Sequence, residues 1–381
     1  MKKIIQIILI YLLFVPFIIS AQKNSTLSKR TLNSIELTLQ ATKIINSIGY
    51  TVWPNWNVEN QTFFIGEKDN NCIFINPQFI IPKDFKLLES TSNIYYSKKC
   101  ILETELIGTI LKIDNNYYKA VSLTMFPSKK QHYYINRINQ FTKTDKEKND
   151  VISFFNSKEY YMSVIVHEAF HFYQKKHKKL YRYRTKKPHY YNKKKVQILS
   201  YIEGDLLRKA LSMKKREDVK SFVVQFLAVR DEKSKFISKK NAYFEKVDEY
   251  IEGTAQYTQS FIMSKQMNSK QQKNNTKYIN YFNYTDSLNF IASMIDIKSP
   301  GHKHYFYGEA QVKILDKLCN GKWRNELFEN NNTFLIELLT KYSSYNENQQ
   351  SELYKGVLKN YNFKIIKDKL IKRHHNNAYK K

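Results

Sequence analysis

The sequence predicts an α+β fold, with an N-terminal helix and a small mixed sheet packed on a mainly helical C-terminal lobe. Apolar residues recur at helical spacing within 25–50. From Thr51 to about Phe126 the pattern changes to short β-branched and aromatic runs interrupted by turn residues, which is typical of strands and hairpins. A polar, charge-mixed stretch at 141–151 then gives way to helical periodicity. These observations place a boundary at this stretch.

The chain is long and apolar enough to bury a sizeable core. Of its 381 residues, 42% are hydrophobic and 15% are aromatic, whereas disordered chains are poor in aromatic residues. The composition therefore excludes a chain that is disordered throughout, and it allows one large domain or two closely packed ones.

The first 21 residues have the features of a secretory signal peptide. Two lysines precede an apolar run from Ile4 to Ile19, which ends in the small residues Ser20 and Ala21. The run is shorter than the ~20 residues that a membrane span needs. We therefore expect a cleaved signal peptide, a secreted or periplasmic protein, and no transmembrane span in the mature chain.

Three regions follow from these patterns: a signal peptide at 1–21, an α+β region at 22–150, and a helical lobe at 151–381. The strands of the α+β region are expected within 50–56, 62–77 and 108–127. The helices of the lobe are expected at 152–179, 196–213, 219–228, 244–267 and 308–318.

Three cysteines remain after the predicted signal peptide, namely Cys72, Cys100 and Cys319. Export would permit disulfides, and one pair with one leftover thiol is the simplest arrangement. Cys72 and Cys100 lie in the same strand-rich region, which makes them the better-placed pair. A cysteine-ligated metal is not indicated, since the chain has no CxxC spacing.

The formal net charge of +29 would favour anionic partners. The lysines are spread along nearly the whole chain, however, as a general compositional bias would spread them, and we expect no nucleic-acid partner. One dense basic cluster runs from Lys175 to Lys195 and contains no acidic residue. We interpret it as a solvated helix end and loop, with contact to an acidic substrate or an anionic envelope surface as the alternative.

The stretch "VIVHEAFHFYQKKH" contains an HExxH motif formed by His167, Glu168 and His171. On an α-helix, residues four apart differ by about 40° around the axis, so both histidines could reach one metal ion. Glu168 is about 100° from His167, which places its carboxylate beside a water on the metal and not on the metal itself. The motif lies in an apolar stretch, where buried ionisable groups are costly unless they are paired or bind a metal. The pattern predicts a zinc site.

A catalytic zinc site has three protein ligands and one open position. The downstream segment "DEYIEGTAQYTQ" offers a third ligand. HExxH followed far downstream by EGxAxY resembles the gluzincin zinc peptidases, in the aminopeptidase-like clan of zincin-like fold. The resemblance implies that Glu252 is the third zinc ligand beside His167 and His171, and that Glu168 is the catalytic base. The GxMEN motif of that family is absent, so aminopeptidase activity is not implied.

Alternatives for the third ligand stay open at this point. Glu203 also precedes a glycine, and Glu249 lies one helical turn before Glu252. In another zincin type the motif continues as HExxHxxGxxH, and His177 occupies its last position. Gln174 replaces the glycine that lets the chain turn there, so on a continuous helix His177 would face away, about 240° from His171.

Two further expectations concern the packing of the Glu252 helix and the donor to the oxyanion. Gly253 and Ala255 are small, which would let their helix approach the HExxH helix closely. Stabilisation of the transition state needs a donor aimed at the developing oxyanion. Tyr305 and Tyr307, just before a predicted helix, are the first candidates, with His304 and Tyr257 as alternatives.

The sequence thus predicts a secreted zinc metallopeptidase that hydrolyses a peptide or protein substrate, with Zn²⁺ as its cofactor. Two other functions use the same residues. One is a basic envelope-associated binding protein whose metal site is structural or inactive. The other is a zinc hydrolase that acts on non-peptide amides.

Overall fold

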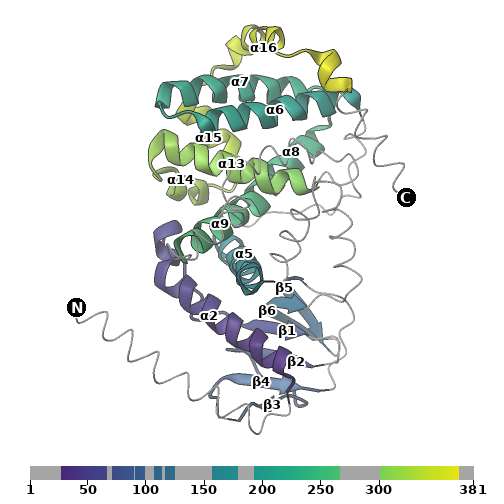
Figure 1. Ribbon diagram of the computed structural model, residues 1–381, viewed down its shortest axis with the longest axis vertical. Coiled ribbons are helices and arrows are strands. Elements are labelled where there is room, and N and C mark those ends of the chain that lie inside the picture. Colours follow the sequence, from purple (N-terminus) through teal and green to yellow (C-terminus); the bar gives the residue numbers. More distant parts are fainter. Residues whose placement is uncertain are drawn as a thin grey trace, which may run out of the picture. The chain divides into compact units, whose positions relative to one another are not determined.

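The computed structural model describes residues 27–66, 71–89, 91–98, 107–113, 116–124, 157–178, 193–266 and 301–368. Within these ranges the fold is α+β, mostly helical with one small mixed sheet, as the sequence predicts (Figure 1). No helix in these ranges is both long enough and apolar enough to cross a membrane. The expected signal peptide, the boundary at 141–151, Cys100 and residues 179–192 of the basic cluster lie outside the described residues.

The chain divides into two compact units, and two helices contribute to both. The strand unit contains helix α2 (Lys29–Val52) up to Ser47, the sheet, and helix α5 (Lys158–His177) up to Phe172. The helical unit contains the end of α2, the last turn of α5 and the helices that follow. The HExxH motif therefore belongs to the strand unit, and the EGTAQY segment belongs to the helical unit.

The sheet has the strand order β3-β4-β2-β1-β6-β5 in the described part of the chain. Its members are β1 (Phe63–Gly66), β2 (Cys72–Ile75), β3 (Lys86–Leu87), β4 (Ile94–Ser97), β5 (Ile107–Ile113) and β6 (Asn116–Thr124). β1 pairs parallel with β6, and the other pairs are antiparallel. The strands expected within 62–77 and 108–127 are confirmed as β1, β2, β5 and β6.

The strand expected at 50–56 is wrong. Helix α2 continues to Val52, and the hydroxyl of Thr51 donates to the Ile48 carbonyl inside it at 2.7 Å. The chain then turns at Asn55, which adopts a left-handed conformation with φ of 60°. The β-branched residues Thr51 and Val52 therefore lie in the last turn of a helix and not in a strand.

Both faces of the central strands β1 and β2 are buried. Side chains alternate across a strand, and one face contributes Phe64, Cys72 and Phe74 to a core cluster with Leu111 and Ile113. Cys72 is disulfide-bonded. Cys319, in the helical unit, is a free thiol and donates to the Leu315 carbonyl at 3.1 Å.

The helical unit is organised around one central helix, α13 (Gly301–Cys319), which packs against α6, α7, α8, η2, α9, α14 and α15. The neighbouring bounds are α6 Lys194–Ser212, α7 Arg216–Ser234, α8 Lys239–Asp248, the π-helical turn η2 Glu249–Gly253, α9 Thr254–Gln266, α14 Trp323–Glu329, α15 Leu335–Ser343, the 3₁₀ turn η3 Glu347–Gln349 and α16 Gln350–Lys359. α8 begins after Ser238, whose hydroxyl accepts a hydrogen bond from the Asn241 N–H at 3.2 Å.

The expected helices of this unit are present with three differences. The single helix expected at 244–267 is interrupted by the π-helical turn η2. α13 begins at Gly301, seven residues before the expected start, so Tyr305 and Tyr307 lie inside it. Its first turns bury the polar residues Lys303 and His304. Buried polar residues interrupt the apolar spacing from which a helix is predicted. The helices α14, α15 and α16 were not predicted.

Candidate metal centre

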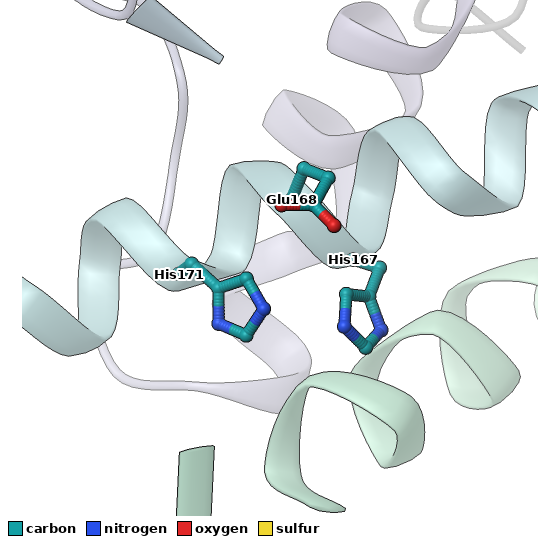
Figure 2. Close-up of side chains that lie close together, drawn as sticks. All are labelled: His167, Glu168 and His171. Carbon is teal, nitrogen blue, oxygen red and sulfur yellow. The ribbon is translucent and has the colours of Figure 1, made fainter. Parts of the chain in front are cut away.

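Helix α5 brings the three residues of the HExxH motif together. The surrounding side chains bury its apolar face, with Ile165 and Ala169 fully enclosed. His167 is 6% exposed and Glu168 is 9% exposed. Figure 2 shows both imidazole rings extending from the same side of α5, with the Glu168 side chain displaced around the helix. The sequence pattern predicts this arrangement.

The ligand atoms of His167, Glu168 and His171 all lie within 4.8 Å of one another. The two imidazole rings have centroids 4.8 Å apart and are nearly perpendicular, at 86°. Zinc binds imidazole nitrogen at about 2.0–2.1 Å, so two histidine nitrogens on one tetrahedral zinc lie roughly 3.3 Å apart. Imidazole nitrogens and a carboxylate oxygen are ligand types that zinc binds, so the chemistry of this group fits zinc. No second such group of three occurs in the described ranges.

The segment before β1 also contacts the HExxH helix. Gln61, which is 8% exposed, donates from Nε2 to the Ala169 carbonyl at 3.3 Å. Ala169 lies between the two histidines on the helix. This hydrogen bond ties the motif to the strand unit, so the helix that carries the histidines is fixed near its middle.

α5 continues without a break through Gln174 to His177. His177 is therefore six residues past His171 on a regular helix and faces about 240° away around the axis. Its ring packs on Tyr173, with centroids 4.2 Å apart, and on Phe328, with centroids 5.2 Å apart. Burial and the nearby Lys176 lower the pKa of His177. The geometry gives this histidine an aromatic packing role in the helical unit.

Two of the three candidate carboxylates belong to a buried charge cluster in the helical unit. This cluster consists of Glu203, Glu245, Glu249, Arg230, Lys233 and Lys303, each at most 9% exposed as a side chain. It contains three acids and three bases, so its charges balance, as buried charges require.

Both oxygens of Glu203 and Glu249 are paired within that cluster. Glu203 accepts from Arg230 Nε and from Lys233 Nζ, both at 2.6 Å. Glu249 accepts a bidentate pair from Arg230 at 2.8 and 3.1 Å. Burial alone would raise the pKa of Glu249, but Arg230 and His304 outweigh it and hold that pKa well below its ordinary value.

Glu252 lies in the π-helical turn η2 and is 7% exposed. It belongs to the helical unit, whereas the two histidines belong to the strand unit, and its ligation of the metal stays a prediction. π-helical turns occur as single-turn bulges inside α-helices, frequently at functional sites. The EGTAQY segment therefore begins within a π-helical turn that its sequence did not reveal.

Gly253 packs against another helix of the helical unit, α13. A Cβ on Gly253 would lie 2.3 Å from Gly308 Cα, and one on Gly308 would lie 2.0 Å from the Glu249 carbonyl oxygen. The small residue thus permits a backbone-to-backbone crossing of η2 with α13, and the expected approach to the HExxH helix stays a prediction. Gly308, which the sequence did not single out, is the matching half of this crossing.

The tyrosines of the helical unit differ in what their hydroxyls do. Tyr307 is fully buried and donates to the Ser200 carbonyl at 2.5 Å. Tyr257, from the EGTAQY segment, donates to Asp316 Oδ2 at 2.7 Å and accepts from Arg324 at 2.8 Å. Tyr305 is half-buried on α13. Tyr307 therefore serves a helix contact in this structure, and Tyr305 is the more accessible of the two oxyanion candidates.

Besides Gly308, the sequence did not reveal the importance of Gln174 and Arg230. Gln174 is 3% exposed and donates to the backbone of η2, while Arg230 binds Glu249 at the first position of η2. A glutamine in the apolar run "EAFHFYQ" is a polar group that needs a buried partner, and that signal was available. No such signal marks Arg230, because its partners Glu203 and Glu249 lie on other helical segments.

No family model, no curated protein and no solved structure matches the chain. The chemistry of the site is therefore the basis for assigning a function. That chemistry consists of two imidazoles and an adjacent carboxylate on one helix.

Proposed function

We propose that the chain is a secreted zinc-dependent peptidase of the zincin type. The observation that carries the proposal is the group formed by His167, Glu168 and His171, whose ligand atoms lie within 4.8 Å of one another on one helix. Two imidazoles at helical spacing with a carboxylate next to the first supply two ligands and a base. The substrate would be a peptide or protein.

Glu252 is the third ligand in this proposal. The paired carboxylates of Glu203 and Glu249 support this choice, because withdrawing either one would leave buried cations without their partner. The unbroken helix through His177 supports it as well, since it turns that ring away from His171. A glutamate is a suitable third ligand beside two histidines in a catalytic zinc site.

The catalytic chemistry is divided between the metal and the chain. A zinc ion held there supplies a Lewis acid that lowers the pKa of a water molecule toward neutrality and polarises the substrate carbonyl. Glu168 removes the proton from the attacking water and delivers it to the leaving nitrogen. Tyr305 is the proposed donor to the oxyanion, because the Tyr307 hydrogen is already donated to Ser200.

The proposed compartment is outside the cytoplasm. The charged and apolar start of the chain has the features of a signal peptide. The disulfide at Cys72 supports the same compartment, because disulfides persist in oxidising environments. The basic cluster from Lys175 to Lys195 is the candidate contact for an anionic envelope surface.

Glu168→Gln tests the proposed activity. The amide has nearly the same shape and cannot accept the proton, so zinc and the fold are retained while hydrolysis slows by about 10²- to 10⁴-fold. The assay is hydrolysis of an unstructured protein substrate at equal zinc occupancy. Glu159→Gln, at the first turn of the same helix, is the matched control and keeps the wild-type rate.

The outcomes separate the three functions that share these residues. Equal rates for wild type and Glu168→Gln would show that Glu168 is not the base. Zinc binding without hydrolysis of any peptide would favour the envelope-binding protein. Hydrolysis of small amides without cleavage of the protein substrate would favour the non-peptide hydrolase.

A further inference from the structure

The π-helical turn η2 joins α8 and α9 and contains Glu252 as its fourth residue. Such a turn amounts to one extra residue in an α-helix, and it breaks the regular pairing of backbone carbonyls. A buried carbonyl without a donor is costly, so a stable turn of this kind needs hydrogen bonds from elsewhere.

Gln174 supplies such hydrogen bonds, in addition to the Thr254 N–H that donates to the Tyr250 carbonyl. Its Nε2 donates to the Ile251 carbonyl at 2.8 Å, to the Tyr250 carbonyl at 3.3 Å, and to Thr254 Oγ1 at 2.6 Å. The Thr254 hydroxyl in turn donates to the Tyr250 carbonyl at 2.7 Å. The two amide hydrogens are thus shared among acceptors on either side of Glu252 in the sequence.

The same turn is held at both of its ends. Glu249 is the first residue of the turn. Its carboxylate accepts hydrogen bonds from Arg230 and from Gln311, each 2.8 Å long at its shortest. Gly253, its last residue, lies against the backbone of Gly308. Contacts at the start and at the end fix where the turn lies, while the Gln174 contacts act on the carbonyls within it.

Loss of the extra residue would change where Glu252 points. If η2 returned to α-helix, the helix after the turn would rotate relative to α8 by about one residue step, ~100°. A carboxylate ligand must be held close to its productive direction for a metal site to keep its affinity.

We infer that Gln174 is a positioning residue for the metal site, which stabilises the π-helical turn and so sets the direction of Glu252. Gln174 lies three residues after His171 on α5. Helix α5, which carries the proposed ligands His167 and His171, therefore also carries the amide that stabilises the turn containing Glu252. This inference rests on the proposed role of Glu252 as a zinc ligand.

Gln174→Met tests the inference in the full chain. Methionine has a similar volume but no donor, so the Tyr250 and Ile251 carbonyls lose their bond to it. We expect zinc affinity, measured by competition titration with a chelating indicator, to fall by about 10- to 100-fold. The visible absorption spectrum of the cobalt-substituted protein should also change, because it reports the geometry of the ligands.

Gln350→Met is the matched control. Gln350 also donates an amide hydrogen to a backbone carbonyl of the helical unit, that of Ala228 at 3.3 Å. Its loss removes the same type of bond without touching η2. Zinc affinity and the cobalt spectrum should match the wild type, which separates a positioning role from simple loss of stability.

Thr254→Val is the second variant and decides the question if Gln174→Met does not fold. It removes the hydroxyl that links Gln174 to Tyr250 and should weaken zinc binding in the same direction, while Thr254→Ser keeps the hydroxyl and restores affinity. A wild-type affinity and cobalt spectrum in Gln174→Met, or in Thr254→Val where Gln174→Met is unfolded, would overturn the inference.

Glu252→Ala distinguishes failure of the inference from failure of the proposed ligand set. If Glu252→Ala weakens zinc binding and Gln174→Met does not, only the positioning role is wrong. If Glu252→Ala binds zinc as the wild type does, the assignment of the third ligand is wrong and the inference falls with it.

Discussion

Gly308→Ala probes the crossing of α13 with the π-helical turn. The added Cβ would lie 2.0 Å from the Glu249 carbonyl oxygen, about 1.4 Å closer than an ordinary contact, and 2.6 Å from Gly253 Cα. These neighbours are backbone atoms, which cannot rotate away. Overpacking of this kind costs about 3 kcal/mol, at the upper end of its usual range. The better helix propensity of alanine offsets about 1 kcal/mol, so we expect a net loss of about 2 kcal/mol.

Tryptophan fluorescence during urea denaturation measures this loss of stability in the helical unit, which contains the crossing. The three tryptophans of the chain, Trp53, Trp56 and Trp323, are all buried and all belong to the helical unit. The midpoint should fall while the slope of the transition stays constant. A larger slope would instead indicate a change in the surface exposed on unfolding.

Gly356→Ala is the matched control for Gly308→Ala. Gly356 lies in α16, and a Cβ there meets nothing within 4 Å. The same substitution should therefore stabilise the protein by about 0.5–1 kcal/mol through helix propensity. Opposite signs at the two glycines support the crossing. A Gly308→Ala variant that is as stable as Gly356→Ala would refute it.

Two further predictions concern the buried charge cluster. Glu203→Gln leaves Arg230 and Lys233 with one carboxylate fewer and should lower the free energy of unfolding by about 3 kcal/mol. The control is Glu217→Gln, in an ion pair whose carboxylate is 78% exposed, and it should change the free energy of unfolding by less than about 0.5 kcal/mol. Equal losses of the two variants in urea titrations would contradict the burial argument. The lowered pKa of Glu249 contributes stability that is present above its ordinary value of 4.5 and is lost as the pH falls below it. The urea midpoint of the wild type should accordingly decrease on acidification below about pH 4.5. Glu249→Gln should make the midpoint less dependent on pH in that range. An unchanged dependence of the midpoint on pH would assign the acid sensitivity to other groups.

The HExxH helix and the hairpins could be predicted from the sequence because their determinants are local. Apolar spacing and the motif within it define α5, and turn residues separate the paired strands. The first turns of α13 could not be predicted. Lys303 is buried there only because Glu245, from α8, pairs with it at 2.7 Å, and such a partner is invisible to a window of neighbouring residues.

The π-helical turn could not be predicted for the same reason. Its stabilising contacts come from Gln174 on α5, Arg230 on α7 and Gly308 on α13. Gln174 illustrates this limit: in the sequence it is only the residue that stands in place of the glycine of HExxHxxGxxH, whereas in the structure it donates to the backbone of η2. The segment "EYIEG" contains two of the candidate ligands, Glu249 and Glu252. The pairing of Glu249 with Arg230 separates their roles.

The zinc content of the purified protein tests the central claim most directly. Elemental analysis after gentle purification should find about one zinc per chain, as a single catalytic site requires. His171→Ala should lose that zinc, and His177→Ala should keep it, because His177 packs on Tyr173 and Phe328 instead. A wild-type protein that contains no zinc and takes up none on addition would contradict the account, as would a His171→Ala variant that binds zinc like the wild type.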